Sequence, residues 1–67
     1  MIQLSVNGQE TRLEHGANIA RLLEQLELSG KRVAVEKNGE IVPRSRYGDT
    51  ALADGDALEI VVAVGGG

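Results

Sequence analysis

The chain has 67 residues, and we expect it to form one small domain. Ten acidic residues outnumber seven basic ones, and a formal net charge of −3 argues against electrostatic capture of nucleic-acid phosphates. Cysteine is absent, which excludes disulfides, thiolate metal sites and a covalent thiol mechanism. The N-terminal segment has neither a signal-peptide pattern nor a long apolar run, so we expect a cytoplasmic protein without a membrane partner.

The first strands are expected near the N-terminus. Apolar and polar residues alternate over residues 2–6, which is typical of a half-buried strand. Asn7-Gly8 then indicates a hairpin turn of type I′, because both central positions of that turn need a positive φ. The returning strand is expected over about residues 9–14.

A helix is expected to follow Asn18, which has the side chain of a helix N-cap. Apolar residues at the spacing i, i+3, i+4 and i+7 then form one face that should be buried. The residues of this face are Ile19, Leu22, Leu23 and Leu26. Gly30 is expected to end the helix, with Lys31 close to the negative end of its dipole.

Strand patterns return in the second half of the chain. Residues 33–36 alternate, Asn38-Gly39 repeats the hairpin signal, and a short strand is expected over 40–42. Pro43 lacks an N–H group and should end that strand or leave it at a sheet edge.

The remaining residues lead into the closing strand. Residues 44–53 look irregular, with one short helical turn near Tyr47, and 54–56 read as a turn. The closing strand is expected over 57–64. Its second half is apolar on both sides, which suits a central place in a sheet.

This order of elements predicts an α+β fold of the β-grasp (ubiquitin-like) type. We expect a mixed sheet of four to five strands, with the first and last strands paired at its centre and one main helix packed on one face. The domain is expected over residues 1–64, followed by a flexible tail over 65–67.

The tail consists of Gly65, Gly66 and Gly67. Glycine adds nothing to a core and has the largest ordering cost of any residue, so folding gives little reason for three of them. Three extended residues would carry a terminal carboxylate about 10 Å past the strand, with no Cβ to obstruct a narrow channel. The tail would then enter a partner's active site; the competing interpretation is a disordered chain end.

Catalytic and metal-binding patterns within the chain are weak. His15 is the one histidine, and the serines are scattered along the sequence, so a Ser–His–Asp set would need a coincidence of folding. Asp54 and Asp56 flank a glycine, a pattern that indicates a turn more often than a metal site. We therefore expect no catalytic residue, bound cofactor or metal in this chain.

Several segments together resemble the sulfur carriers of thiamin biosynthesis, the ThiS family of ubiquitin-like proteins. The most specific is Asn-Gly-Glu-Ile-Val-Pro-Arg at 38–44; the helix start at 18–23, Leu-Ala-Asp-Gly-Asp at 52–56 and Val-Gly-Gly-Gly at 64–67 agree with it. The resemblance covers the whole chain. The Gly-Gly ending alone discriminates weakly, because ubiquitin-like carriers share it.

The resemblance implies a carrier and not an enzyme. A ubiquitin-activating-type adenylating enzyme would use ATP and Mg²⁺ to adenylate the carboxylate of Gly67. A persulfide sulfur donor protein would then supply sulfur to give a thiocarboxylate, and thiazole synthase would take that sulfur for the thiazole ring. Two other functions stay open: the small subunit of molybdopterin synthase, with the same thiocarboxylate chemistry, and a ubiquitin-like modifier or binding module.

A partner-binding surface is expected beside the tail. If the closing strand turns Leu58 and Ile60 toward the helix, Val61 and Ala63 lie on the helix-free face and, with Val64, could form a docking patch. The alternative is that they are ordinary strand formers. Arg44 and Arg46 could pair with acidic groups of a partner or could be solvated surface charges.

Overall fold

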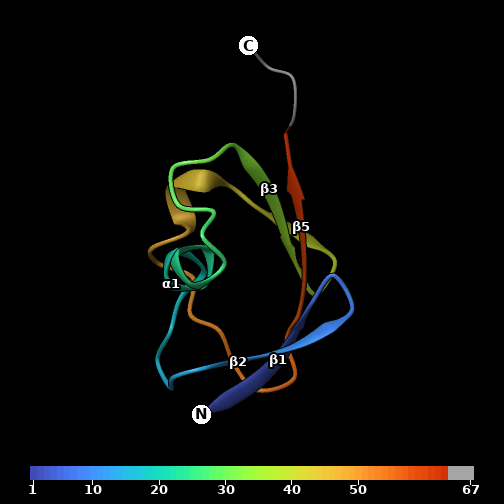
Figure 1. Cartoon of the computed structure of the whole chain (residues 1–67). Helices are drawn as coiled ribbons and strands as arrows, with labels where there is room; N and C mark the ends of the chain where they lie inside the picture. Colours follow the sequence, from blue (N-terminus) through green and yellow to red (C-terminus); the bar gives the residue numbers. More distant parts are fainter. Residues whose placement is uncertain (64–67) are drawn as a thin grey trace.

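In the computed structural model, which describes residues 1–63, five strands form one mixed sheet and a single α-helix lies across one face (Figure 1). The elements in chain order are β1 (Ile2–Val6), β2 (Gln9–Leu13), α1 (Ile19–Gln25), β3 (Val33–Lys37), β4 (Glu40–Val42), the 3-10 turn η1 (Arg44–Arg46) and β5 (Ala57–Val62). This is the expected β-grasp order.

The sheet places the last strand in its centre. The strand order is β2-β1-β5-β3-β4, and β5 runs parallel to β1 and antiparallel to β3. The parallel pairing is short, with Ser5 opposite Ala57 and Val6 opposite Leu58. The antiparallel pairing with β3 extends over five residue pairs, from Lys37 opposite Leu58 to Val33 opposite Val62. The expected central position of the closing strand is therefore confirmed.

The core lies between α1 and one face of the sheet. Ile19 and Leu22 of the helix are fully buried, Leu23 is buried, and Leu26 packs half-buried at the edge of the core. The sheet contributes the inward residues of each alternating strand: Ile2, Leu4, Val6, Leu13, Val35, Leu58 and Ile60. Leu52, the candidate for the core in the irregular segment, is buried, and Tyr47 of the same segment is buried as well.

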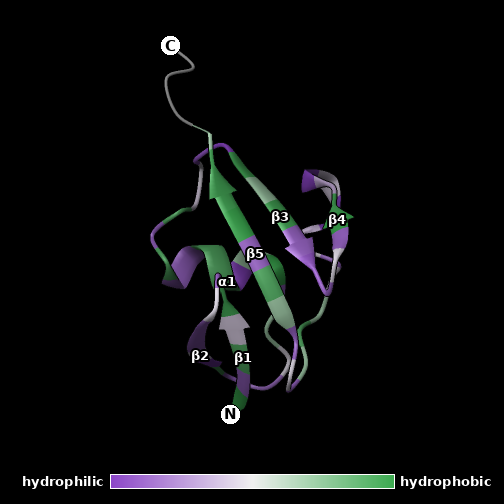
Figure 2. Ribbon diagram, turned by 90° about the vertical axis from the view of Figure 1, so that its right-hand side faces the viewer, coloured by the Kyte–Doolittle hydropathy of each residue, from purple (hydrophilic) through white to green (hydrophobic). Residues whose placement is uncertain are grey.

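The opposite face of the sheet carries no helix within residues 1–63, and we call it the open face (Figure 2). Alternation along β5 turns Ala57, Glu59 and Val61 onto this face, while Leu58 and Ile60 are buried. Because side chains on adjacent strands share a face at each residue pair, Ala34 and Glu36 of β3 lie there as well.

The helix ends earlier than the sequence indicated, at Gln25 and not at Gly30. Leu26 is the C-cap, and Glu27 follows in the left-handed conformation with φ 60°. The Glu27 N–H donates to the Glu24 carbonyl at 3.0 Å, and the Leu28 N–H donates to the Leu23 carbonyl at 2.8 Å. These two bonds form a Schellman motif, in which Glu27 stands where glycine is usual.

The prediction of Gly30 was wrong because the side chain after the cap decides where the helix stops. Leu28 packs against the core, so the chain must reverse before it, and this holds Glu27 in a conformation that glycine adopts more easily. Lys31 lies in the following loop, where its N–H donates to the Leu28 carbonyl, so its expected position at the helix end is also wrong. β5 ends at Val62, and Val64 lies outside the described residues.

Replacing Glu27 with glycine should stabilise the fold. Glycine removes the steric cost of the left-handed conformation, and we expect Glu27→Gly to raise the free energy of unfolding by about 0.5–1 kcal/mol. Urea unfolding measures this change. The control is Ala20→Gly at an exposed position inside α1, which should lower stability by about 1 kcal/mol. A loss of stability in both variants would contradict the cap assignment.

Candidate functional site

The residues expected to carry the chemistry, Gly65, Gly66 and Gly67, lie outside the described residues, as does Val64. The expected boundary between domain and tail lies there too. The structure does describe the strand that leads to them and the surface beside it. Val61 is 65% exposed and Ala63 is exposed, and Val61 lies on the open face as expected. Their part in docking stays a prediction.

The strand that leads to residues 64–67 is held by an asparagine from the first hairpin. Asn7 has φ 52°, as a type I′ turn requires, and its backbone N–H donates to the Leu58 carbonyl at 2.9 Å. Its side chain pairs with both backbone groups of Ile60: Nδ2 donates to the carbonyl at 3.0 Å, and Oδ1 accepts from the N–H at 2.8 Å. The amide thus continues the short β1·β5 pairing past the end of β1.

The asparagine of the second hairpin holds the other end of the same strand. Asn38 has φ 52°, donates its backbone N–H to the Ala57 carbonyl at 2.8 Å and accepts the Ala57 N–H on Oδ1 at 2.9 Å. Its Nδ2 donates to Asp56 at 3.0 Å. Both hairpin asparagines therefore bind β5, a role that the sequence analysis missed because it read them only as turn formers.

The aspartates flanking Gly55 stabilise the turn, as the sequence favoured. Asp56 is buried and also accepts the Ala53 N–H at 2.8 Å, while Asp54 accepts the Gln3 N–H at 2.6 Å. Within residues 1–63 no group of three or more acidic or histidine side chains is placed to hold a metal ion.

His15 lies in the loop before α1. Among the described residues 1–63, no hydrogen bond joins it to a serine. Its Nε2 is 3.3 Å from the N-terminal amine of Met1. The helix of the described region is too short and polar to cross a lipid bilayer.

A shallow groove of about 310 Å³ lies on the open face where β5 ends. The residues that line it are Arg32, Val33, Ala34, Arg44, Val61 and Ala63. A hydrogen bond of 2.9 Å from the Ala63 N–H to the Arg32 carbonyl fixes the start of β3 beside the end of β5. Four apolar residues and two arginines therefore line the groove, and one of them, Ala63, directly precedes residues 64–67 in the chain.

The two arginines that the sequence analysis treated together are separated by the structure. Arg44 borders this groove, whereas Arg46 lines a different recess together with Lys37 and Glu40. Both side chains are exposed, and both residues belong to η1. The short turn directs them to different surfaces.

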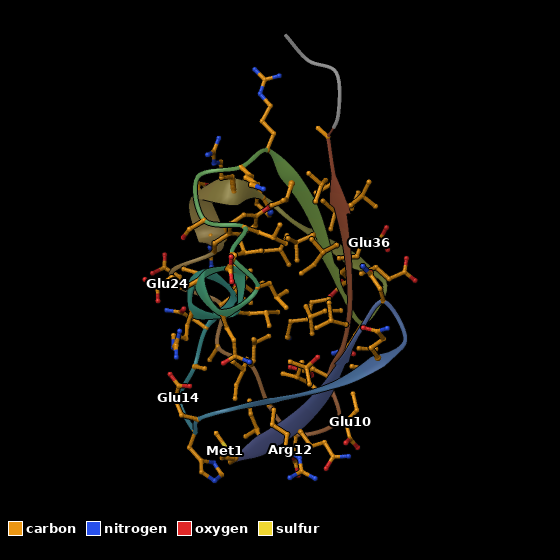
Figure 3. The ribbon with its side chains drawn as sticks, in the orientation of Figure 1. Met1, Glu10, Arg12, Glu14, Glu24 and Glu36 are labelled. Atoms are coloured by element: carbon orange, nitrogen blue, oxygen red, sulfur yellow. The ribbon has the colours of Figure 1, made fainter. Side chains whose placement is uncertain are left out.

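Two carboxylates lie one row further along the open face. Glu36 of β3 is directly opposite Glu59 of β5, and Ile41 of β4 is opposite Glu36. Figure 3 shows Glu36 on the side of the sheet away from α1. Ile41 is 77% exposed, so this row combines like charges with an uncovered apolar side chain.

The side chains with a displaced pKa, Glu14 and Arg21, are not on the open face. A hydrogen bond from Arg21, with a Nε to Oε2 distance of 2.7 Å, lowers the pKa of the Glu14 carboxyl, and Glu14 in turn raises the pKa of Arg21. Arg21 belongs to α1, and Figure 3 shows Glu14 on the helix side of the molecule. This exposed pair ties the loop before α1 to the helix and takes no part in the open face.

Known proteins are similar to this chain over nearly all of its length. The ThiS family model matches residues 3–67. The sulfur carrier protein ThiS of Bacillus subtilis is 40% identical, with 96% of this chain and 98% of that protein covered. A crystal structure of the thiamine biosynthesis protein ThiS from Geobacter metallireducens superposes with a TM-score of 0.82 at 35% identity, covering 98% of this chain and 100% of the other.

A larger protein contains a similar region. A thiazole synthase of Paramagnetospirillum magneticum is 44% identical over 98% of this chain, but the chain spans only 20% of that protein. The similarity therefore concerns one segment of the synthase.

Replacing Asn7 with glycine should destabilise the fold, although glycine suits the turn. The change leaves both backbone groups of Ile60 without their amide partner, and we expect a loss of about 2 kcal/mol in the free energy of unfolding. Urea unfolding of Asn7→Gly and Glu27→Gly makes a matched comparison, since both residues have a positive φ. If both variants were more stable than the unmodified chain, the side-chain amide of Asn7 would contribute nothing to the stability of the fold.

Proposed function

The chain belongs to the ThiS family, and from this premise we propose that it carries sulfur for the thiazole ring of thiamin as a thiocarboxylate on Gly67. One observation carries the proposal: the family match extends through residue 67 and so includes the three glycines that the sequence singled out. The central position of β5 supports it, because the strand that leads to these residues is held on both sides.

The chemistry begins with a carboxylate that must be activated. A terminal carboxyl group has an ordinary pKa of about 3.3–3.7, so near neutral pH it is an anion and a poor electrophile. An adenylating enzyme of the ubiquitin-activating type would use ATP and Mg²⁺ to join the carboxylate oxygen to the α-phosphorus, with release of pyrophosphate. The acyl carbon of Gly67 then has AMP as a good leaving group.

Sulfur enters at that carbon. The terminal sulfur of a donor persulfide attacks the acyl-adenylate, the C–O bond to AMP breaks, and a thiol cleaves the remaining S–S bond to leave the thiocarboxylate. Thiazole synthase takes this sulfur, the C–S bond breaks as water supplies an oxygen to the acyl carbon, and the carrier returns as the carboxylate. The chain is consumed and regenerated as a protein co-substrate, so it is a carrier and not an enzyme.

The contribution of this chain is delivery. Gly65 and Gly66 form a stem without Cβ atoms that passes through a narrow channel, and β5 holds the stem to the domain. The domain over residues 1–64 serves as the part that partners hold. Val61 and Ala63 are exposed, and we propose that they form the docking surface together with Val64.

Thiazole synthase is proposed as the acceptor because a protein of that name contains a segment 44% identical to this chain. The presence of such a segment in a synthase supports the transfer of sulfur between a carrier of this kind and a thiazole synthase. We place these reactions, with the adenylating enzyme and the persulfide donor, in the cytoplasm.

Deleting Gly67 should abolish adenylation and leave the fold intact. The deletion shortens the stem by one residue and moves the carboxylate away from the α-phosphorus, so ATP–pyrophosphate exchange with the adenylating enzyme should fall to background. Thermal unfolding of the deleted and full chains should coincide. Exchange at the full rate by the deleted chain would contradict the assignment of Gly67.

The identity of the acceptor is tested by offering the thiocarboxylate form to two different acceptor enzymes. The thiocarboxylate form should support thiazole formation with thiazole synthase, and the large subunit of molybdopterin synthase should not accept its sulfur. Product formation by each acceptor is followed by chromatography. Transfer to the molybdopterin enzyme alone would replace the thiazole assignment and keep the carrier chemistry.

A further inference from the structure

Both hairpin turns contain the dipeptide Asn-Gly, at residues 7–8 and 38–39. Asparagine is a thermolabile residue because its side-chain amide can be lost by deamidation. In that reaction the backbone N of the next residue attacks the amide carbon, and glycine has no Cβ to hinder the attack. Asn18 is followed by the branched residue Ile19 and provides a comparison within the same chain.

The reaction consumes water and needs no enzyme. The glycine N–H gives its proton to a base in the solvent, the new N–C bond closes a succinimide ring, and the C–N bond of the side-chain amide breaks with release of ammonia. Water then adds to either ring carbonyl and opens the ring, which leaves aspartate or isoaspartate. A neutral amide that donates hydrogen bonds is thus replaced by a carboxylate that only accepts them.

The folded chain holds the Asn7 side chain away from this reaction. Closing the ring requires rotation about the Cα–Cβ and Cα–C bonds of Asn7. Its hydrogen bonds to the backbone of Ile60, at 3.0 and 2.8 Å, fix the first bond. The pairing of Val6 with Gln9 on either side of the turn fixes the second, with φ of Asn7 at 52°. Attack by Gly8 therefore requires that the asparagine first leaves β5.

The second hairpin is held in the same way. Asn38 accepts the Ala57 N–H on Oδ1 at 2.9 Å and donates from Nδ2 to Asp56 at 3.0 Å, and the pairing of β3 with β4 closes its turn. Both asparagines thus depend on β5 for the fixed position of their side chains. Because β5 also supplies buried residues to the core, separating this strand from both hairpins opens the core.

Modification at Asn38 has a further consequence. The Nδ2 atom that leaves is the partner of the Asp56 carboxylate, and Asp56 is buried. An acidic residue at position 38 brings a second carboxylate against this one, and like charges in contact at a buried position are unfavourable. The contact between the second hairpin and the start of β5 is then lost.

We propose that Asn7 and Asn38 are sites of spontaneous deamidation that pairing with β5 shields, and that modification at Asn38 prevents β5 from pairing again. Opening of the core exposes both sites, so prolonged unfolding becomes irreversible. The rate of modification of the folded chain is the rate of the unfolded chain multiplied by the fraction of open molecules.

The shielding is tested by time courses of the full chain in buffer and in urea that unfolds it, at one mildly alkaline pH and one temperature. Peptide mapping by mass spectrometry reports the exchange of NH2 for OH at each asparagine. In urea Asn7 and Asn38 should be modified while Asn18 stays intact, and in buffer modification should be at least about tenfold slower. A smaller difference at either hairpin would overturn its shielding, and an asparagine that stays intact in urea is not a site.

The link to the core is tested with Ala20→Gly, which weakens α1 at an exposed position and leaves both hairpins unchanged. The variant should speed modification in buffer by about fivefold, because more molecules are open, and leave the rate in urea unchanged. An unchanged rate in buffer would show that the hairpins open without the core, against the proposal.

The effect of the product is tested by comparing Asn38→Asp with Asn38→Gly. Both variants remove the amide, and glycine accepts the φ of 52° without strain, so the comparison isolates the new carboxylate. Asn38→Asp should unfold at a lower temperature than Asn38→Gly near neutral pH, and the difference should shrink toward about pH 4, where carboxyl groups bind protons. Equal unfolding temperatures at neutral pH would overturn the proposed conflict with Asp56.

Discussion

The pairing of β5 with β1 on one side and β3 on the other is the constraint on which the rest of the structure depends. The strand supplies Leu58 and Ile60 to the core, and the same strand leads to the glycines. Its parallel pairing with β1 covers two residue pairs only, which is little for the central strand of a sheet. The side chains of Asn7 and Asn38 add hydrogen bonds at both ends of the strand.

In a domain this small, the hydrogen bonds that hold β5 matter for the stability of the whole fold. A chain of this length buries a modest fraction of its surface, so every strand contact has a large share in stability. The helix and the inward face of the sheet use most of the large apolar residues, and no helix covers the open face within residues 1–63 (Figure 2). The core and the proposed docking surface are thus the two sides of one sheet.

Much of the fold could be predicted from the sequence because local and long-range signals agree. Alternation set which residues of β1 and β5 face the core, and Asn-Gly twice marked a hairpin that the structure has. The helix start at Asn18 followed from its capping side chain, whose oxygen accepts the Arg21 N–H at 2.8 Å. These features depend on a few neighbouring residues.

The rest depended on contacts between distant parts of the chain. The helix stops before Glu27 because Leu28 packs into the core, and no local pattern announces that contact. The bonds from Asn7 to Ile60 span 53 residues and need the finished sheet. The direction of the Arg44 and Arg46 side chains follows from the 3-10 turn, which the sequence placed only roughly.

The central claim is that Gly67 carries sulfur, and mass spectrometry of the intact chain tests it most directly. After incubation with ATP, Mg²⁺, the adenylating enzyme and a persulfide donor, the chain should gain the mass of one sulfur-for-oxygen exchange. Fragmentation should place that gain on the last residue. An unchanged mass, or a gain located within residues 1–64, would contradict the account.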